Sequence, residues 1–136
     1  MIAWLLSFFC VKQEKTVVAN DLQSRSAGQQ QPRRYAFMLR LRPGAEEAYE
    51  TAHRAVWPEM LQLLKDAGIS EYSIYRRDDL LILALRADDF ETTWSKIDNH
   101  PVNLRWQAAM APYFASIEGL RPGERFPMLE EVFYLR

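Results

Sequence analysis

The sequence predicts an α+β fold, in which a four-stranded antiparallel sheet carries helices on one face. Two patterns predict it. Short segments alternate apolar and polar residues, as half-buried strands do, and longer segments repeat apolar residues every three or four positions, as helices do. Residues that favour turns, mainly Pro, Gly, Asp and Asn, separate these segments. In chain order the segments are strand, helix, strand, strand, helix, helix and strand.

The first strand is predicted over 34–41. Its apolar face carries Tyr35, Phe37, Leu39 and Leu41. A helix follows over about 45–67 and ends at Gly68, a residue typical of helix C-termini. Pro58 lies inside this helical pattern, where it removes a backbone donor and clashes with the preceding turn. We therefore expect the helix to kink or restart near Trp57.

A hairpin is predicted next. Residues 70–76 alternate as a strand with Tyr72 and Ile74 on one face, and a tight turn at 77–79 leads into a second strand over 80–86. The second strand is apolar along its whole length, which favours a central position in the sheet.

Two short helices and a closing strand complete the pattern. The first helix is predicted over 89–98 with Asp88 or Asp89 as its N-cap, and the second over 102–111. The apolar residues assigned to these helices are Phe90, Trp94, Ile97, Leu104, Trp106 and Met110. Prolines and glycines then predict an irregular stretch before a final strand over 131–135.

This element order is the split βαβ arrangement of ferredoxin-like proteins. Such a sheet is covered by helices on one face only. A second copy packed sheet against sheet would cover the other face, so we expect a homodimer.

Composition narrows the classes of function. A chain of 136 residues suits one domain with its own core. The net charge is -1 and the basic residues are scattered, which argues against nucleic acid or an anionic membrane as a partner. The single cysteine, Cys10, excludes an internal disulfide and fits a reducing compartment, so a cytoplasmic location is expected. No cofactor or metal is expected, because the sequence has two histidines and no glycine-rich phosphate loop.

Residues 1–33 are expected to lie outside the domain, which spans 34–136. Residues 1–11 form an uncharged apolar run, too short for the roughly 20 residues that span a bilayer. It is an inconsequential extension, a degenerate targeting signal that would imply export, or a packed element. The following residues, up to 34, are polar and read as a linker.

His53 lies at the margin of the long helical pattern. The apolar stripe of that pattern consists of Ala45, Tyr49, Ala52, Val56, Met60, Leu63 and Ala67. At roughly 100° per residue, His53 is about 60° from the centre of this stripe. Tyr49, His53 and Trp57 are spaced i, i+4, i+8 and so form one wall. A histidine at such an edge is either a structural residue with satisfied hydrogen bonds or part of a ligand pocket.

Six segments in order resemble the L-rhamnose mutarotase family. They are Tyr35-Ala-Phe-Met-Leu39, Tyr49-x-x-x-His53, Val56-Trp-Pro-Glu59, Tyr72-Ser-Ile-Tyr75, Arg105-Trp106 and Glu131-Val-Phe-Tyr-Leu135. The likeness covers about three quarters of the chain, from Arg34 onward. It implies a dimeric ferredoxin-like αβ barrel and a cofactor-free isomerase that interconverts the α and β anomers of L-rhamnose or a related 6-deoxy sugar.

The resemblance also implies roles for particular residues. The family's proton-donating histidine falls on His53, its sugar-binding tyrosines fall on Tyr49 and Tyr72, and its Trp-Trp pair falls on Trp106 and Gln107. Gln107 departs from the family, because a glutamine offers hydrogen bonds where the family offers an aromatic face. This departure bears on which sugar is bound rather than on the reaction.

The chemistry of mutarotation fits a histidine. The reaction opens a hemiacetal ring and closes it on the other face, so a proton must reach the ring oxygen while another leaves the anomeric hydroxyl. Imidazole, with a pKa near 6.5, serves both transfers. Two alternatives stay open at this point: a non-catalytic dimeric module that binds a small metabolite or a partner, and a cofactor-free monooxygenase on a related barrel.

Overall fold

The computed structural model describes residues 31–136, and the predictions for residues 1–30 lie outside the described residues. The strands are β1 (Arg33–Arg40), β2 (Ser70–Arg77), β3 (Leu80–Ala87) and β4 (Met128–Leu129). The helices are α1 (Glu46–Arg54), α2 (Pro58–Asp66), α3 (Phe90–Asp98) and α4 (Pro101–Met110), and a 3₁₀ turn, η1 (Ala111–Tyr113), follows α4. The predicted break near Trp57 is thus a complete restart of the helix.

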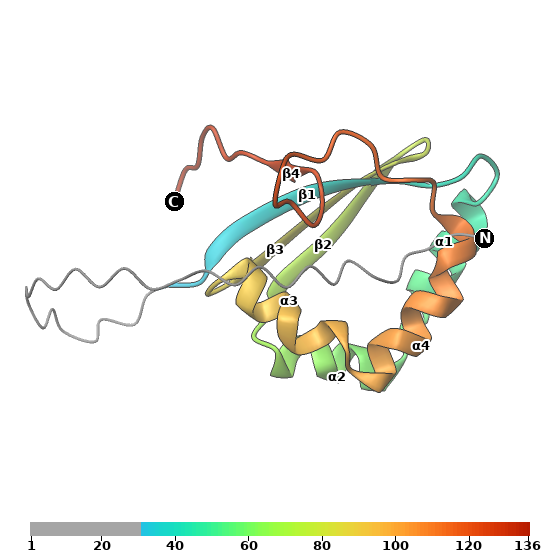
Figure 1. The fold of residues 1–136 in the computed structure, drawn as a ribbon, viewed down its shortest axis with the longest axis horizontal. Coiled ribbons are helices and arrows are strands. Elements are labelled where there is room, and N and C mark those ends of the chain that lie inside the picture. The colour runs from blue at the N-terminus through green and yellow to red at the C-terminus, as the bar shows by residue number, and fades with distance from the viewer. Residues whose placement is uncertain (1–30) are drawn as a thin grey trace, which may run out of the picture.

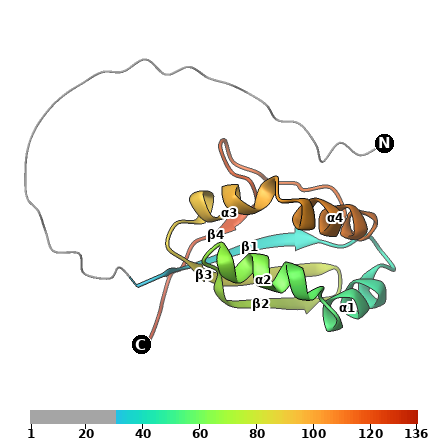
Figure 2. The ribbon, with the colours of Figure 1, turned by 90° about the horizontal axis from the view of Figure 1, so that it is seen from below.

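The four strands form one antiparallel sheet in the order β2-β3-β1-β4. All four helices lie on the same side of this sheet (Figure 1). Viewed from that side, α1 and α2 run along one half of the sheet and α3 and α4 along the other (Figure 2). This is the predicted ferredoxin-like arrangement, with β3 in the predicted central position.

The core lies between the sheet and the helices. Strands β1 and β3 send alternate residues into it, because successive side chains of a strand point to opposite faces. The most deeply buried of the large side chains are Phe37, Leu41, Leu81 and Ile97. Leu104, which we assigned to a helix with Trp106 and Met110, is instead exposed on α4, whereas the other two are buried.

The predicted helix boundaries have visible causes. Of the two predicted caps of α3, Asp88 and Asp89, the structure has Asp89, whose Oδ1 accepts a hydrogen bond of 2.8 Å from the Thr92 amide. Gly68 ends the α2 segment with a φ of 96°, a left-handed conformation that glycine adopts without steric cost.

The predicted closing strand over 131–135 is wrong. The final strand is β4, which pairs Leu129 with Ala36 and Met128 with Phe37. Continuing this register would place Val132 opposite Arg33, where β1 begins. The residues beyond Val132 would therefore extend past the start of β1 and have no strand residues to pair with. Val132 and Phe133 are 93% and 78% exposed. Within the described residues, no helix is long and apolar enough to cross a membrane.

Candidate active site

His53 owes its position to the end of α1. Glu46 and Glu47 occupy the first turn of that helix, where its dipole favours negative charge. The helix ends at Arg54, and α2 begins with Pro58 at its first position, where the missing N–H of proline costs no hydrogen bond. His53 therefore lies in the last turn before a break, with its side chain at an edge rather than in the middle of a packed face.

The imidazole of His53 is half-buried and held on two sides by aromatic rings. Its Nδ1 lies 2.9 Å from the Tyr49 carbonyl oxygen. Because a carbonyl only accepts, Nδ1 carries the proton, and the neutral ring keeps its lone pair on Nε2. The Tyr49 ring lies 4.0 Å away between centroids, and the Trp106 ring meets the imidazole edge-on at 5.4 Å.

The environment of His53 favours its neutral form. Burial lowers the pKa of the imidazole below its usual 6.5, and the hydrogen bond to the Tyr49 carbonyl offsets part of this effect. At neutral pH the ring is thus mostly unprotonated. Its Nε2 is then a proton acceptor, poised to become a donor once it has taken up a proton.

A large pocket of about 510 Å³ opens beside His53, and residues from α1, α2, β2, α3 and α4 line it. Four of the five site residues predicted from the sequence line it together: His53, Tyr72, Trp106 and Gln107. Trp106 is held in place by Trp57, whose ring it meets edge-on at 5.2 Å. The pocket thus has polar groups set among aromatic and aliphatic walls, as ligand sites usually do.

Tyr72 enters the large pocket from an irregular part of β2. The register between β2 and β3 shifts between Ser70 and Ser73, and Glu71 adopts a positive φ of 48°. Such bulges re-aim side chains next to functional sites. Burial raises the pKa of the Tyr72 phenol, and the Tyr49 phenol nearby raises it further. Tyr72 therefore stays protonated at neutral pH and available as a hydrogen-bond donor.

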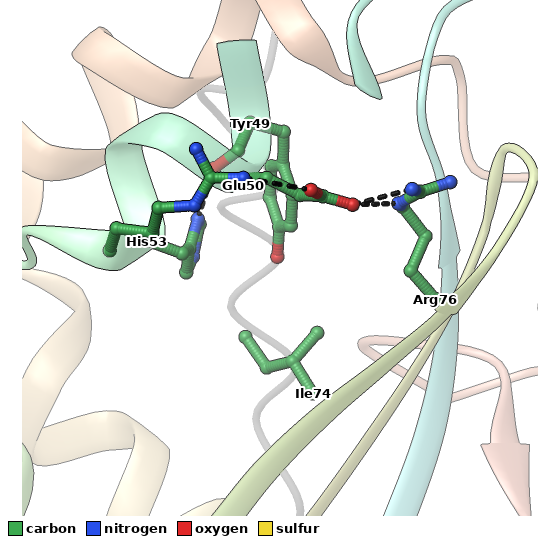
Figure 3. A pocket seen from close by; sticks show the side chains of 6 residues that line it. Tyr49, Glu50, His53, Ile74 and Arg76 are labelled. Carbon is green, nitrogen blue, oxygen red and sulfur yellow. Dashed lines mark hydrogen bonds and ion pairs between the residues drawn. The ribbon is translucent and has the colours of Figure 1, made fainter. Parts of the chain in front are cut away.

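Tyr49, the fifth predicted residue, does not line the large pocket. It is 4% exposed and contributes to a small pocket of about 410 Å³. Figure 3 shows this pocket, with Tyr49 and His53 on α1 facing Ile74 on β2. His53 and Ile74 line both pockets. Burial raises the pKa of the Tyr49 phenol, so it too stays protonated.

The small pocket has a charged rim. The Glu50 carboxylate receives hydrogen bonds from Arg76 of β2 at 2.7 Å and from Arg54 at 3.4 Å (Figure 3). The contact to Arg76 ties α1 to β2 beside His53. All three side chains are substantially exposed, so the contribution of this network to stability is modest.

Sequence reasoning missed two features of the site. The Glu50–Arg76 pair joins residues 26 positions apart, and no local pattern indicates it. Asn103 is a buried amide in the wall of the large pocket, 5% exposed. Its spacing from Trp106 and Gln107, three and four residues, is a helical signal that could have placed it on the same face.

The other histidine, His100, lies outside both pockets. It is exposed, and its Nδ1 accepts a hydrogen bond of 3.2 Å from the Val102 amide at the start of α4. No group of three or more His, Cys, Asp or Glu residues in the part of the chain that the structure describes is arranged to hold a metal ion.

Comparisons with known proteins decide the family. A family model described as L-rhamnose mutarotase matches residues 34–135. The chain belongs to the L-rhamnose mutarotase family. The family match extends over the sheet, all four helices and both pockets, so the site described above lies within the part of the chain that the family shares.

Individual relatives agree with the family model. The L-rhamnose mutarotase of Sinorhizobium medicae is 41% identical over 106 residues, covering 76% of this chain and 98% of the relative. That of Phocaeicola vulgatus is 33% identical over 107 residues, with the same coverage. The crystal structure of an L-rhamnose mutarotase from Formosa agariphila superposes with a TM-score of 0.60 at 31% identity, covering 76% of this chain and 99% of the other. The chain is thus an isomerase of this family.

Proposed function

We propose that this chain interconverts the α and β anomers of L-rhamnose, or of a related 6-deoxy sugar, by acid–base catalysis without a cofactor. The placement of His53 carries the proposal. Its neutral imidazole lies between Tyr49 and Trp106 where two pockets meet, with Nδ1 fixed by a carbonyl and Nε2 left for proton transfer. The relatives are named L-rhamnose mutarotases, and mutarotation proceeds by proton transfers that such a group can carry out.

The reaction uses His53 twice. Neutral His53 takes the proton of the anomeric hydroxyl at Nε2 while the bond between C1 and the ring oxygen breaks, and a water molecule protonates that oxygen. Rotation about the C1–C2 bond then turns the other face of the aldehyde toward the C5 hydroxyl. As the ring closes, the C5 hydroxyl gives its proton to the hydroxide left by that water molecule, and the imidazolium returns its proton to the new anomeric oxygen. A correctly placed acid or base of this kind contributes roughly 10²–10⁴-fold to the rate.

The other predicted residues bind and position the sugar. Tyr72 donates a hydrogen bond from its protonated phenol, and Trp106 offers an apolar face to the C–H side of the ring. Gln107 adds hydrogen-bonding groups at the mouth of the same pocket. Tyr49 lies behind the imidazole, which it orients through its carbonyl oxygen, and donates from its phenol toward the small pocket.

The chain is further proposed to work as a homodimer in the cytoplasm. The face of the sheet opposite the helices carries a row formed by Met38, Ile82 and Tyr75, which are cross-strand partners, and Tyr75 is 61% exposed. A second copy packed on this row would remove it from water. Sedimentation equilibrium tests the dimer, and a monomer at micromolar concentration would reject it.

The proposed cytoplasmic location is supported by the single cysteine, which fits a reducing compartment.

Saturation-transfer NMR of L-rhamnose tests the activity, with L-fucose, L-lyxose and D-mannose for comparison. The protein is expected to accelerate exchange between the anomers above the spontaneous rate. His53→Ala should lower the catalysed rate by about 10²–10⁴-fold. His100→Asn is the matched control, because it changes the other histidine, keeps a good helix cap and should leave the rate unchanged. Exchange at the spontaneous rate with wild type would instead favour the non-catalytic binding module.

A further inference from the structure

Asn103 is a buried amide that the reaction described above does not use. It lies on α4, one helical turn before Trp106 and Gln107, and all three line the large pocket. Its side chain is 5% exposed, and only one other polar or charged residue, Thr93, is buried in the described part of the chain. An amide enclosed in this way needs hydrogen-bond partners.

The hydrogen bonds that Asn103 makes are long. Its Nδ2 donates to the Asp98 carbonyl oxygen at 3.4 Å, and its Oδ1 accepts from Gln107 Nε2 at 3.4 Å. Hydrogen bonds between N–H and O are most often about 2.9–3.0 Å. An amide side chain has two N–H donors and a carbonyl oxygen with two lone pairs, so both contacts leave capacity unused. The amide pair, Asn103 with Gln107, can therefore bind a further polar group.

The surroundings of the amide pair are apolar. Trp94, Ile97 and Trp106 line the large pocket from the same two helices, α3 and α4. The groups proposed to handle the reacting end of the sugar, His53 and Tyr72, belong instead to α1 and β2. Figure 2 shows α4 and α1 on different halves of the helical layer. A sugar bound at His53 thus presents a different edge to the amide pair.

We propose that the amide pair hydrogen-bonds a hydroxyl on the exocyclic carbon of the sugar, and so extends the substrate range from 6-deoxy sugars to 6-hydroxy aldohexoses. This inference rests on the proposed function. In this placement the C5 methyl group of L-rhamnose, its one substituent that forms no hydrogen bond, would lie against Asn103 and Gln107 and leave their amides without a ligand partner. The hydroxyl of a hydroxymethyl group at C5 both donates and accepts hydrogen bonds, so it can serve as the missing partner of the Asn103 and Gln107 amides.

L-Mannose and L-rhamnose provide the test, because they differ only by the hydroxyl at C6. Anomer exchange is measured on both sugars for wild type, Asn103→Leu and Gln107→Leu. Wild type is expected to act on both. Each variant should lower kcat/KM for L-mannose about tenfold more than it lowers kcat/KM for L-rhamnose, because only L-mannose has the C6 hydroxyl and so loses about one more hydrogen bond. Ala108→Gln, which adds an amide on the exposed side of α4, should leave both values unchanged.

The outcomes separate this inference from the proposed function. Wild type that accelerates neither sugar rejects the proposed function itself. Wild type that acts on L-rhamnose but not on L-mannose overturns the inference alone, and so do variants that lose activity equally on the two sugars. If Asn103→Leu does not fold, Gln107→Leu decides, because Gln107 is exposed and its replacement leaves the core intact.

Discussion

The two histidines of the described chain lie in similar local settings and differ in almost everything else. His53 occupies the last turn of α1, a few residues before Pro58, which starts α2. His100 immediately precedes Pro101, which starts α4. Each therefore borders a helix break made by a proline. The neighbouring proline therefore does not distinguish the two histidines.

Their hydrogen bonds have opposite directions. The Nδ1 of His53 donates to the Tyr49 carbonyl oxygen, whereas the Nδ1 of His100 accepts from the Val102 amide. His53 is half-buried between two aromatic rings, and His100 is exposed. In His53 this leaves Nε2 free for proton transfer at a pocket. In His100 the acceptor nitrogen Nδ1 is used to cap α4. Tertiary surroundings, not the residue type or its distance from a proline, separate a candidate catalyst from a cap.

The pH dependence of activity should sharpen this comparison most. Because burial lowers the pKa of His53 below 6.5 and the neutral ring is the active form, kcat/KM should be flat above pH 7. Below the pKa of His53 it should fall tenfold per pH unit, with a midpoint below 6.5. Anomer exchange between pH 4.5 and 8 measures this. The acidic limb should persist in His100→Asn, and a midpoint clearly above 6.5 would contradict the assignment.

The same shift in the pKa of His53 affects stability with a definite sign. Since the folded state binds the proton less tightly than the unfolded chain, the unfolded state holds more protons in the window between the lowered pKa and 6.5. The free energy of unfolding therefore rises with pH through that window. The contribution is fully present above 6.5 and is lost as the pH falls through the lowered pKa.

Removing the cap should have a smaller effect, on stability rather than on activity. His100→Ala deletes the acceptor of the Val102 amide and should lower the free energy of unfolding by about 1 kcal/mol, within the range of 0.5–2 kcal/mol for lost caps. Chemical denaturation measures this. His100→Asn should restore most of the loss, since asparagine is a strong N-cap. A loss of catalysis in a folded His100→Ala protein would mean that the two histidines are not separated as described.

Patterns within one element could be read from the sequence. The alternation of β1, the continuous apolar run of β3, the restart at Pro58 and a cap at Asp88 or Asp89 all depend on neighbouring residues, and the structure confirms them, with Asp89 as the cap. The convergence of His53, Tyr72 and Trp106 came from a family likeness rather than from spacing. Geometry brings these residues to one pocket, and their roles there stay a proposal.

Features that depend on distant partners could not be read. The segment 131–135 alternates like a strand, but β1 is too short in the β4 register to pair with it. Asn103 looks like an ordinary helical residue until its burial is known. Likewise Glu50 reads as a solvated helix charge, although it binds Arg76 on another element.

Removing the Glu50–Arg76 ion pair should have the smallest effect of these changes. It tests whether the charged residues at the edge of the small pocket contribute to stability or to the activity of His53. Glu50→Gln should lower the free energy of unfolding by less than about 1 kcal/mol, because both partners are partly exposed, and high salt should erase the difference. Glu47→Gln is the matched control on α1, since Glu47 makes no ion pair within the described residues.

Activity should change by less than about twofold in Glu50→Gln, because His53 is oriented by the Tyr49 carbonyl and by ring contacts and not by Glu50. A loss of tenfold or more, with the fold intact, would instead make Glu50 part of proton transfer. The small pocket, rather than water in the large one, would then supply the second proton of ring opening. The size of this one effect therefore decides on which side of His53 that proton moves.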